Sequence, residues 1–242
     1  MILANVRQQL TRDDAQLALR LVSRGSATAL ERAEGTLRDR GIDALLDDPR
    51  LLPALIDSRQ ASHASFPFFA YVVVRNALRD VNETDRGIAD YVASILVHFG
   101  ERERARRVAE ADDEVYDTLA RILEDVDRGE PARTFLVRAH LGNYALWLSG
   151  LYPDYIEQRR WRRGGPDMDY FDELGRLGYE LAAQHRLAAQ YGMDELFATA
   201  AERFPLLRLA LNRVSDALFF PAHHSPERLM RQVRDEVRWV QN

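Results

Sequence analysis

The chain has 242 residues, of which 46% are hydrophobic and 29% are charged, values typical of a globular protein that buries a sizeable core. All 33 basic residues are arginine and the net charge is −5, so chemistry that needs lysine (Schiff bases, pyridoxal phosphate, kinases and the usual P-loop) is excluded. Because the sequence has no cysteine, disulfides, thiolate zinc sites, iron–sulfur clusters and cysteine nucleophiles are excluded as well.

The N-terminal segment predicts a pair of helices. Thr11 followed by Asp14 is typical of a helix start, and Ser26 begins a second apolar periodicity, so we expect a helical hairpin through Gly25. The stretch DDPRLLPALIDS predicts a further short helix. Charged residues come too early for a signal peptide, and the longest apolar run, 66–74, is about half of the roughly 18 residues that a membrane span needs. We therefore expect a cytoplasmic protein without a membrane segment.

The stretch FPFFAYVVV has the β-branched and aromatic composition of a buried strand, but the apolar spacing beyond it is helical. We interpret it as a helix, because a lone strand has no partner with which to pair. The same spacing predicts helices over 85–99, 115–126 and 226–240. Further helices are expected over 131–149, 153–163, 167–191, 194–203 and 205–219. The predicted fold is all-α, a compact bundle of about ten helices in a single domain 1–242, with no substantial β-sheet; an N-terminal subdomain 1–60 packed on a core 61–242 is left open.

The helix over 131–149 is the most hydrophobic and is expected to be central. His140, Asn143 and Trp147 fall on one side of it, at i, i+3 and i+7, and His185 ends a stripe of small residues that begins at Gly175. These four residues are the candidates for a ligand pocket, a general base or a metal site. The alternatives are a hydrogen-bonded pair of His140 and Asn143 in the core and close helix packing along the small residues.

The segment RRWRRGGP joins four arginines, Arg159, Arg160, Arg162 and Arg163, to Trp161 and a strong helix stop. Cations stabilise a helix C-terminus, so the segment is interpreted first as the end of a helix with partner salt bridges. Arginines also bind phosphates and acidic proteins, and a tryptophan stacks on bases. Because the chain is net acidic, nucleic acid is the disfavoured ligand.

The segment EADDEVYD is the only candidate for a metal site that contains several carboxylates. Glu110, Asp113, Glu114 and Asp117 share one predicted helical face, where carboxylates can hold magnesium. The spacing from Asp113 to Asp117 resembles the aspartate-rich motifs of isoprenoid synthases, which implies pyrophosphate chemistry. No second motif of this kind follows, and acidic residues also stabilise the first turn of a helix.

The sequence predicts a protein-interaction or self-associating module, since amphipathic helices abound and no HExxH, GxSxG or GxGxxG motif occurs. Expected partners are a protein or a second copy of the chain, and no cofactor is expected. Two other functions stay open. One is a small-molecule or metal-binding enzyme with a pocket near His140 and His185, and the other is phosphate or nucleic-acid binding through the arginines 159–163.

Overall fold

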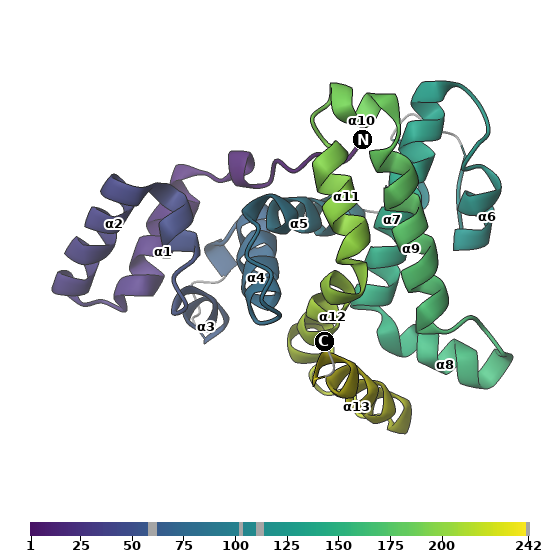
Figure 1. The fold of residues 1–242 in the computed structure, drawn as a ribbon. Coiled ribbons are helices and arrows are strands. Elements are labelled where there is room, and N and C mark those ends of the chain that lie inside the picture. The colour runs from purple at the N-terminus through teal and green to yellow at the C-terminus, as the bar shows by residue number, and fades with distance from the viewer. Residues whose placement is uncertain (58–61, 102–103, 110–113, 241–242) are drawn as a thin grey trace. The chain divides into compact units, whose positions relative to one another are not determined.

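This computed structural model describes residues 1–57, 62–101, 104–109 and 114–240. Within these ranges the chain forms 13 α-helices and no strand, which confirms the predicted all-α, multi-helix fold (Figure 1). Two compact units divide the chain, Ile2–Val97 and His98–Asn242, and the boundary falls inside α5. The single domain over 1–242 and the subdomain over 1–60 stay predictions.

The helices of the first unit precede the boundary inside α5. They are η1 (Arg7–Gln9), α1 (Arg12–Ser23), α2 (Ala27–Leu46), α3 (Leu51–Asp57), α4 (Phe66–Arg79) and most of α5 (Arg86–Gly100). The helices of the second unit are η3 (Arg104–Arg106), α6 (Leu119–Glu124), α7 (Pro131–Leu151), α8 (Pro153–Arg163), α9 (Met168–Ala183), α10 (Arg186–Gln190), α11 (Asp194–Glu202), α12 (Phe204–Val214), the π-helix η4 (Ser215–Phe219) and α13 (Pro226–Val240).

Local hydrogen bonds explain where the first helices begin. The Asp14 carboxylate accepts from the backbone N–H of Thr11 at 2.9 Å, and the Thr11 hydroxyl accepts from the N–H of Asp14, so α1 starts with a reciprocal capping box. Asp14 also accepts from the N–H and hydroxyl of Ser65, which is itself the N-cap of α4. Ser26 caps α2, and α1 and α2 pack on each other, which confirms the predicted hairpin.

The ambiguous apolar stretch FPFFAYVVV lies in α4, so the prediction of a helix there is confirmed. Ser65 caps this helix and a proline stands in its first turn, where the missing N–H costs nothing. The helix predicted over 85–99 is α5, which runs from Arg86 to Gly100.

Two predicted helices were too long. The helix predicted over 115–126 begins only at Leu119, because the side chain of Thr118 caps that position, and Val115 is 44% exposed whereas Tyr116 is buried. The helix predicted over 167–191 is interrupted at His185, whose backbone is extended (ψ 135°) and whose side chain caps α10. In both places a side-chain cap competes with continuation of the helix.

The core of the second unit is α7, on which α6, α8, α9, α10 and α12 pack. Glycines allow the closest approaches. A Cβ on Gly178 of α9 would lie 2.6 Å from the backbone nitrogen of Gly142 in α7, and a Cβ on Gly150 would lie 2.7 Å from Leu211 of α12. A Cβ on Gly175 would likewise collide with the Phe204 ring. The small-residue stripe on α9 is therefore occupied by another helix backbone and by core side chains.

Candidate functional site

His140 lies in α7 within a cluster of aromatic rings. It is 3% exposed, and its ring centroid lies 5.6 Å from Phe99, 6.2 Å from Tyr116 and 6.0 Å from Tyr144. Its Nε2 atom is buried and has no hydrogen-bond partner among the described residues. Burial, with a smaller contribution from the charge of Arg104, lowers the pKa of His140 to about 3, so the ring is neutral at physiological pH.

The other three residues of the predicted pocket have different surroundings. Trp147 shares the aromatic cluster through Phe99, at 5.7 Å between centroids. The Asn143 side-chain oxygen accepts a hydrogen bond from the Tyr179 hydroxyl at 2.9 Å, so Asn143 is paired with α9. His185 stacks on Phe135 at 5.3 Å and caps α10 through Nδ1, which accepts from the N–H of Leu187. Of the four, the structure brings together only His140 and Trp147.

We expect His140→Phe to change how stability depends on pH. The pKa of His140 is about 3 in the folded protein against a reference value of 6.5, so between these values the unfolded chain binds a proton that the folded chain does not. The free energy of unfolding therefore falls as pH drops, by up to about 1.4 kcal/mol per pH unit from this residue. Removing the histidine should flatten that dependence and change stability at pH 7.5 by less than about 1.5 kcal/mol, because an aromatic ring of similar size replaces it.

Urea unfolding between pH 4 and 7.5 measures this effect, with His224→Phe, in an exposed turn, as the control. An unchanged pH dependence in His140→Phe would show that the imidazole is not held neutral by burial.

The carboxylates of EADDEVYD are only partly within the described residues. Glu110 and Asp113 lie outside them. Glu114 and Asp117 are exposed and pair with arginines, Glu114 with Arg121 at 3.6 Å and Asp117 with Arg106 at 3.3 Å. In the part of the chain that the structure describes, no group of three histidine, aspartate or glutamate side chains could hold a metal ion.

The arginine-rich segment ends α8, as predicted. Gly164 adopts a left-handed conformation (φ 65°) and closes the helix. Beside this end is a surface hollow of about 170 Å³, lined by Tyr155, Gln158, Arg159, Arg162 and Arg163. Trp161, on another side of the helix, is 65% exposed.

Within the described residues of the unit, the predicted salt bridges of these arginines do not form. Among the described residues, none of Arg159, Arg160, Arg162 and Arg163 has a carboxylate oxygen within 4 Å; the one polar contact is between Arg159 and the Tyr155 hydroxyl at 3.5 Å. Among the described residues no carboxylate occupies these guanidinium groups, so they can accept an external anion.

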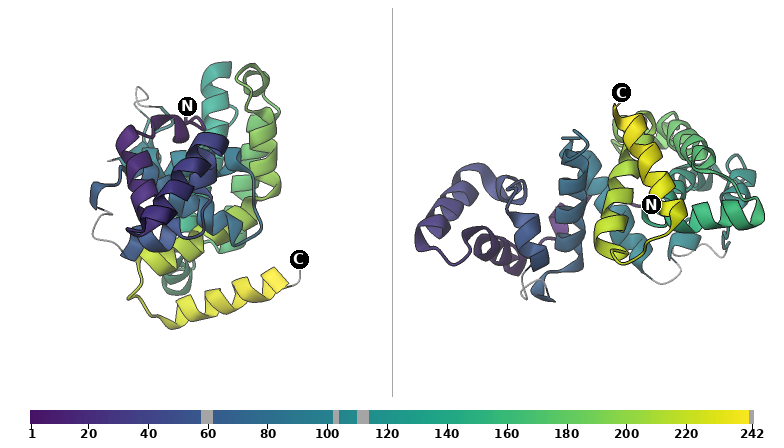
Figure 2. Two further views of the ribbon diagram at one scale, coloured as in Figure 1. Left: turned by 90° about the vertical axis from the view of Figure 1, so that its left-hand side faces the viewer. Right: turned by 90° about the horizontal axis from the view of Figure 1, so that it is seen from below.

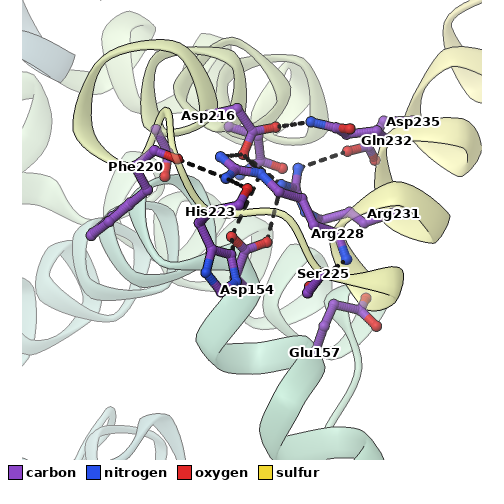
Figure 3. A network of polar contacts seen from close by, with 12 residues as sticks. Asp154, Glu157, Asp216, Phe220, His223, Ser225, Arg228, Arg231, Gln232 and Asp235 are labelled. Atoms are coloured by element: carbon purple, nitrogen blue, oxygen red, sulfur yellow. Dashed lines mark hydrogen bonds and ion pairs between the residues drawn. The ribbon is translucent and has the colours of Figure 1, made fainter.

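The opposite arrangement holds at the other end of α8, where arginines of α13 pair with carboxylates (Figure 3). Arg228 and Arg231 donate to Asp216 at 2.5 and 2.7 Å, and Arg231 also approaches Asp154 of α8 at 3.3 Å. We call these contacts, together with the ion pair of Arg234 and Glu157 at 2.7 Å, the α13 seam. They attach α13 to α8 and to the π-helix η4.

Asp216 is the acceptor that Arg228, Arg231 and Gln232 share. It lies in η4, where the wider helical turn follows directly on α12. Burial alone would raise the pKa of Asp216, but hydrogen bonds from Gln232, Arg228 and Arg231, together with the charge of Arg231, lower it below its ordinary value. The carboxylate is therefore held in its charged form, as the seam requires.

The apolar side of α13 faces solvent. Leu229, Met230 and Val233 are 60%, 59% and 57% exposed, whereas the only buried side chains among residues 226–236 are Arg228 and Arg231. Apolar residues at helical spacing ordinarily face a core, so the outward orientation of this row differs from what its spacing predicts. The signal that could have indicated it is the second row, formed by Arg228, Arg231 and Asp235, at helical spacing on the other side.

Figures 1 and 2 show α13 on the outside of its unit from three directions. The apolar face of α13, defined here as Leu229, Met230 and Val233, is thus a surface feature of a helix that is fixed by its polar side.

Comparison with known proteins adds no assignment: no family model matches the chain, and neither a curated protein nor a solved structure shows significant similarity to it. Among the described residues, every helix is too short or too polar to cross a bilayer.

Proposed function

We propose that this protein is a noncatalytic interaction module that associates with a second copy of itself through the apolar face of α13. The observation that carries the proposal is the exposure of Leu229, Met230 and Val233, each more than half exposed, on a helix whose opposite side is already anchored. Exposed apolar side chains that lie together mark sites of interaction with proteins or other ligands. Such a module would act in the cytoplasm, a setting that suits a chain without cysteine.

A second copy is the occupant that fits this face. A two-fold axis beside α13 would place its apolar row against the same row of the other copy, and such an interface is complementary to itself. The α13 seam supports the proposal further, because a helix already fixed in place loses little conformational freedom on binding.

The size of the face sets the expected affinity. With 15 residues, α13 is about 22 Å long. Two such helices bury less than the roughly 1,600 Å² of a standard stable interface. We therefore expect a weak, concentration-dependent dimer with a Kd on the order of 10–100 μM.

Val233→Glu is expected to weaken this dimer strongly. Burying a carboxylate in place of an apolar side chain should raise the dimer Kd at least about tenfold, while the melting temperature stays unchanged because the position is exposed in the monomer. Sedimentation velocity from 5 to 500 μM measures the dissociation constant directly.

Ala198→Glu, which adds the same charge at an exposed position of α11, is the matched control and should dimerise like the wild type. A wild type that stays monomeric at 500 μM, or a Val233→Glu variant that still dimerises with unchanged affinity, would refute the proposal.

A further inference from the structure

We infer that the C-terminal end of α8 is a docking site for an acidic peptide segment of another protein. This site, the basic end of α8, comprises Tyr155, Gln158 and the five residues of 159–163. It is separate from the apolar face of α13 and does not depend on self-association.

The four arginines at the end of α8 have guanidinium donors that no described carboxylate binds. Elsewhere in the same unit the guanidinium groups of Arg208, Arg228 and Arg231 are matched to carboxylates and are at most 4% exposed. The four arginines at the end of α8 lack such partners among the described residues, although their forked donors suit a carboxylate well. A cluster of unmatched guanidinium groups is complementary to an external carboxylate group.

The size of the hollow favours a peptide side chain over a cofactor. Pockets for drug-sized ligands and cofactors measure roughly 300–1,000 Å³, whereas this hollow holds about 170 Å³, close to the volume of one side chain. Its lining consists of Tyr155, which is 53% exposed, Gln158 and three of the arginines, Arg159, Arg162 and Arg163. One carboxylate side chain of a peptide would fill it, and neighbouring residues of that peptide would lie on the helix end.

The residue composition of the surface favours a protein ligand. Tryptophan, tyrosine and arginine are the residues most enriched among those that dominate protein-binding energies. Trp161 is the most exposed large hydrophobic residue of the described chain, at 65%. In an acidic segment that also carries an apolar side chain, the carboxylates would contact the arginines and the apolar side chain would contact Trp161.

The surrounding charge favours a short acidic segment over a nucleic acid. Only three residues, Gly164 to Pro166, separate the basic end from Asp167, and Asp169 and Glu173 follow at exposed positions on α9. A long polyanion that followed the surface beyond α8 would meet these carboxylates, and the whole chain carries a net charge of −5. A peptide with two or three carboxylates need not extend so far.

The experiment measures the fluorescence anisotropy of a labelled ten-residue peptide of alternating glutamate and leucine against the full chain in 150 mM salt. We expect binding with a Kd on the order of 10–100 μM and at least tenfold weaker binding by the double variant Arg159→Gln, Arg162→Gln. Trp161→Ala should weaken binding about fivefold or more. The corresponding peptide of glutamine and leucine should not bind.

The matched control is the double variant Arg176→Gln, Arg186→Gln, which removes the same charge from exposed positions of α9 and α10. It should bind within about twofold of the wild type. A labelled single-stranded RNA of ten nucleotides provides the competing ligand.

Three results would each overturn the inference. The first is a peptide anisotropy that does not change up to 1 mM protein. The second is peptide binding weakened as much in the control variant as in the Arg159, Arg162 variant. The third is RNA binding that is tighter than peptide binding and is lost in the Arg159, Arg162 variant. The last result would assign the basic end of α8 to nucleic acid.

Discussion

Gly178→Ala is expected to lower the free energy of unfolding by about 3–4 kcal/mol, more than a typical overpacking substitution. The new Cβ would lie 2.6 Å from the backbone nitrogen of Gly142 and 2.9 Å from the carbonyl oxygen of Arg138. Backbone atoms cannot rotate aside as a side chain can, so α7 and α9 would have to separate. Thermal and urea unfolding of the full chain measure the loss.

Gly35→Ala is the matched control for this prediction. Gly35 is inside α2, and a Cβ built on it meets nothing within 4 Å. Alanine favours a helix over glycine by about 1 kcal/mol, so this variant should be as stable as the wild type or slightly more stable. If Gly178→Ala were as stable as the wild type, the backbones of α7 and α9 could not lie as close together at Gly178 as described above.

Arg208→Met should be almost as damaging, with a loss of about 3–5 kcal/mol. The guanidinium group is 3% exposed and donates to the Asp172 carboxylate at 2.6 and 3.2 Å. It also donates to Asn212, whose amide in turn donates to the backbone carbonyls of Ser149 and Gly150 at the end of α7. Removing the arginine leaves the buried Asp172 carboxylate without the guanidinium group that donates to it twice, and the loss of this pair causes most of the destabilisation.

The double variant Arg208→Met, Asp172→Leu tests that explanation. Because both charges are then replaced by apolar groups of similar size, it should recover at least half of the stability lost in the single variant. Arg176→Met, which removes a surface pair with Glu180 at 3.9 Å, should change stability by less than about 0.5 kcal/mol. A double variant no more stable than Arg208→Met would show that the cost does not come from the stranded carboxylate.

Most of the helices could be predicted because their signals are local. Ser65 caps α4 and a proline follows in the first turn, whereas Gly164 ends α8, so these boundaries depend on a few neighbouring residues. The prediction was wrong at Thr118 and His185. Each of these side chains caps a new helix, but the prediction followed the apolar spacing, which continues across both positions.

The candidate sites could be predicted less well, because their partners come from distant parts of the chain. Spacing within α7 placed Asn143 beside His140, but Asn143 is paired with Tyr179 of α9, 36 residues away. Arg231 pairs with Asp216, 15 residues away, and with Asp154, 77 residues away. The polar row of α13 was visible in the sequence, but the carboxylates that bind it were not. Helical periodicity identifies an apolar row but does not tell which surface covers it.

The way in which α13 is attached makes temperature act differently on two parts of the same unit. Around α7 the buried groups are mainly apolar, and their hydration gives unfolding a large positive heat-capacity change, so stability has a maximum and falls on both heating and cooling. Among residues 226–236 the only buried side chains are those of Arg228 and Arg231, so releasing this part of α13 exposes mostly polar groups, whose heat-capacity contribution has the opposite sign. The detachment of α13 therefore lacks the curvature with temperature that the core shows, and local opening at this helix follows its own temperature dependence.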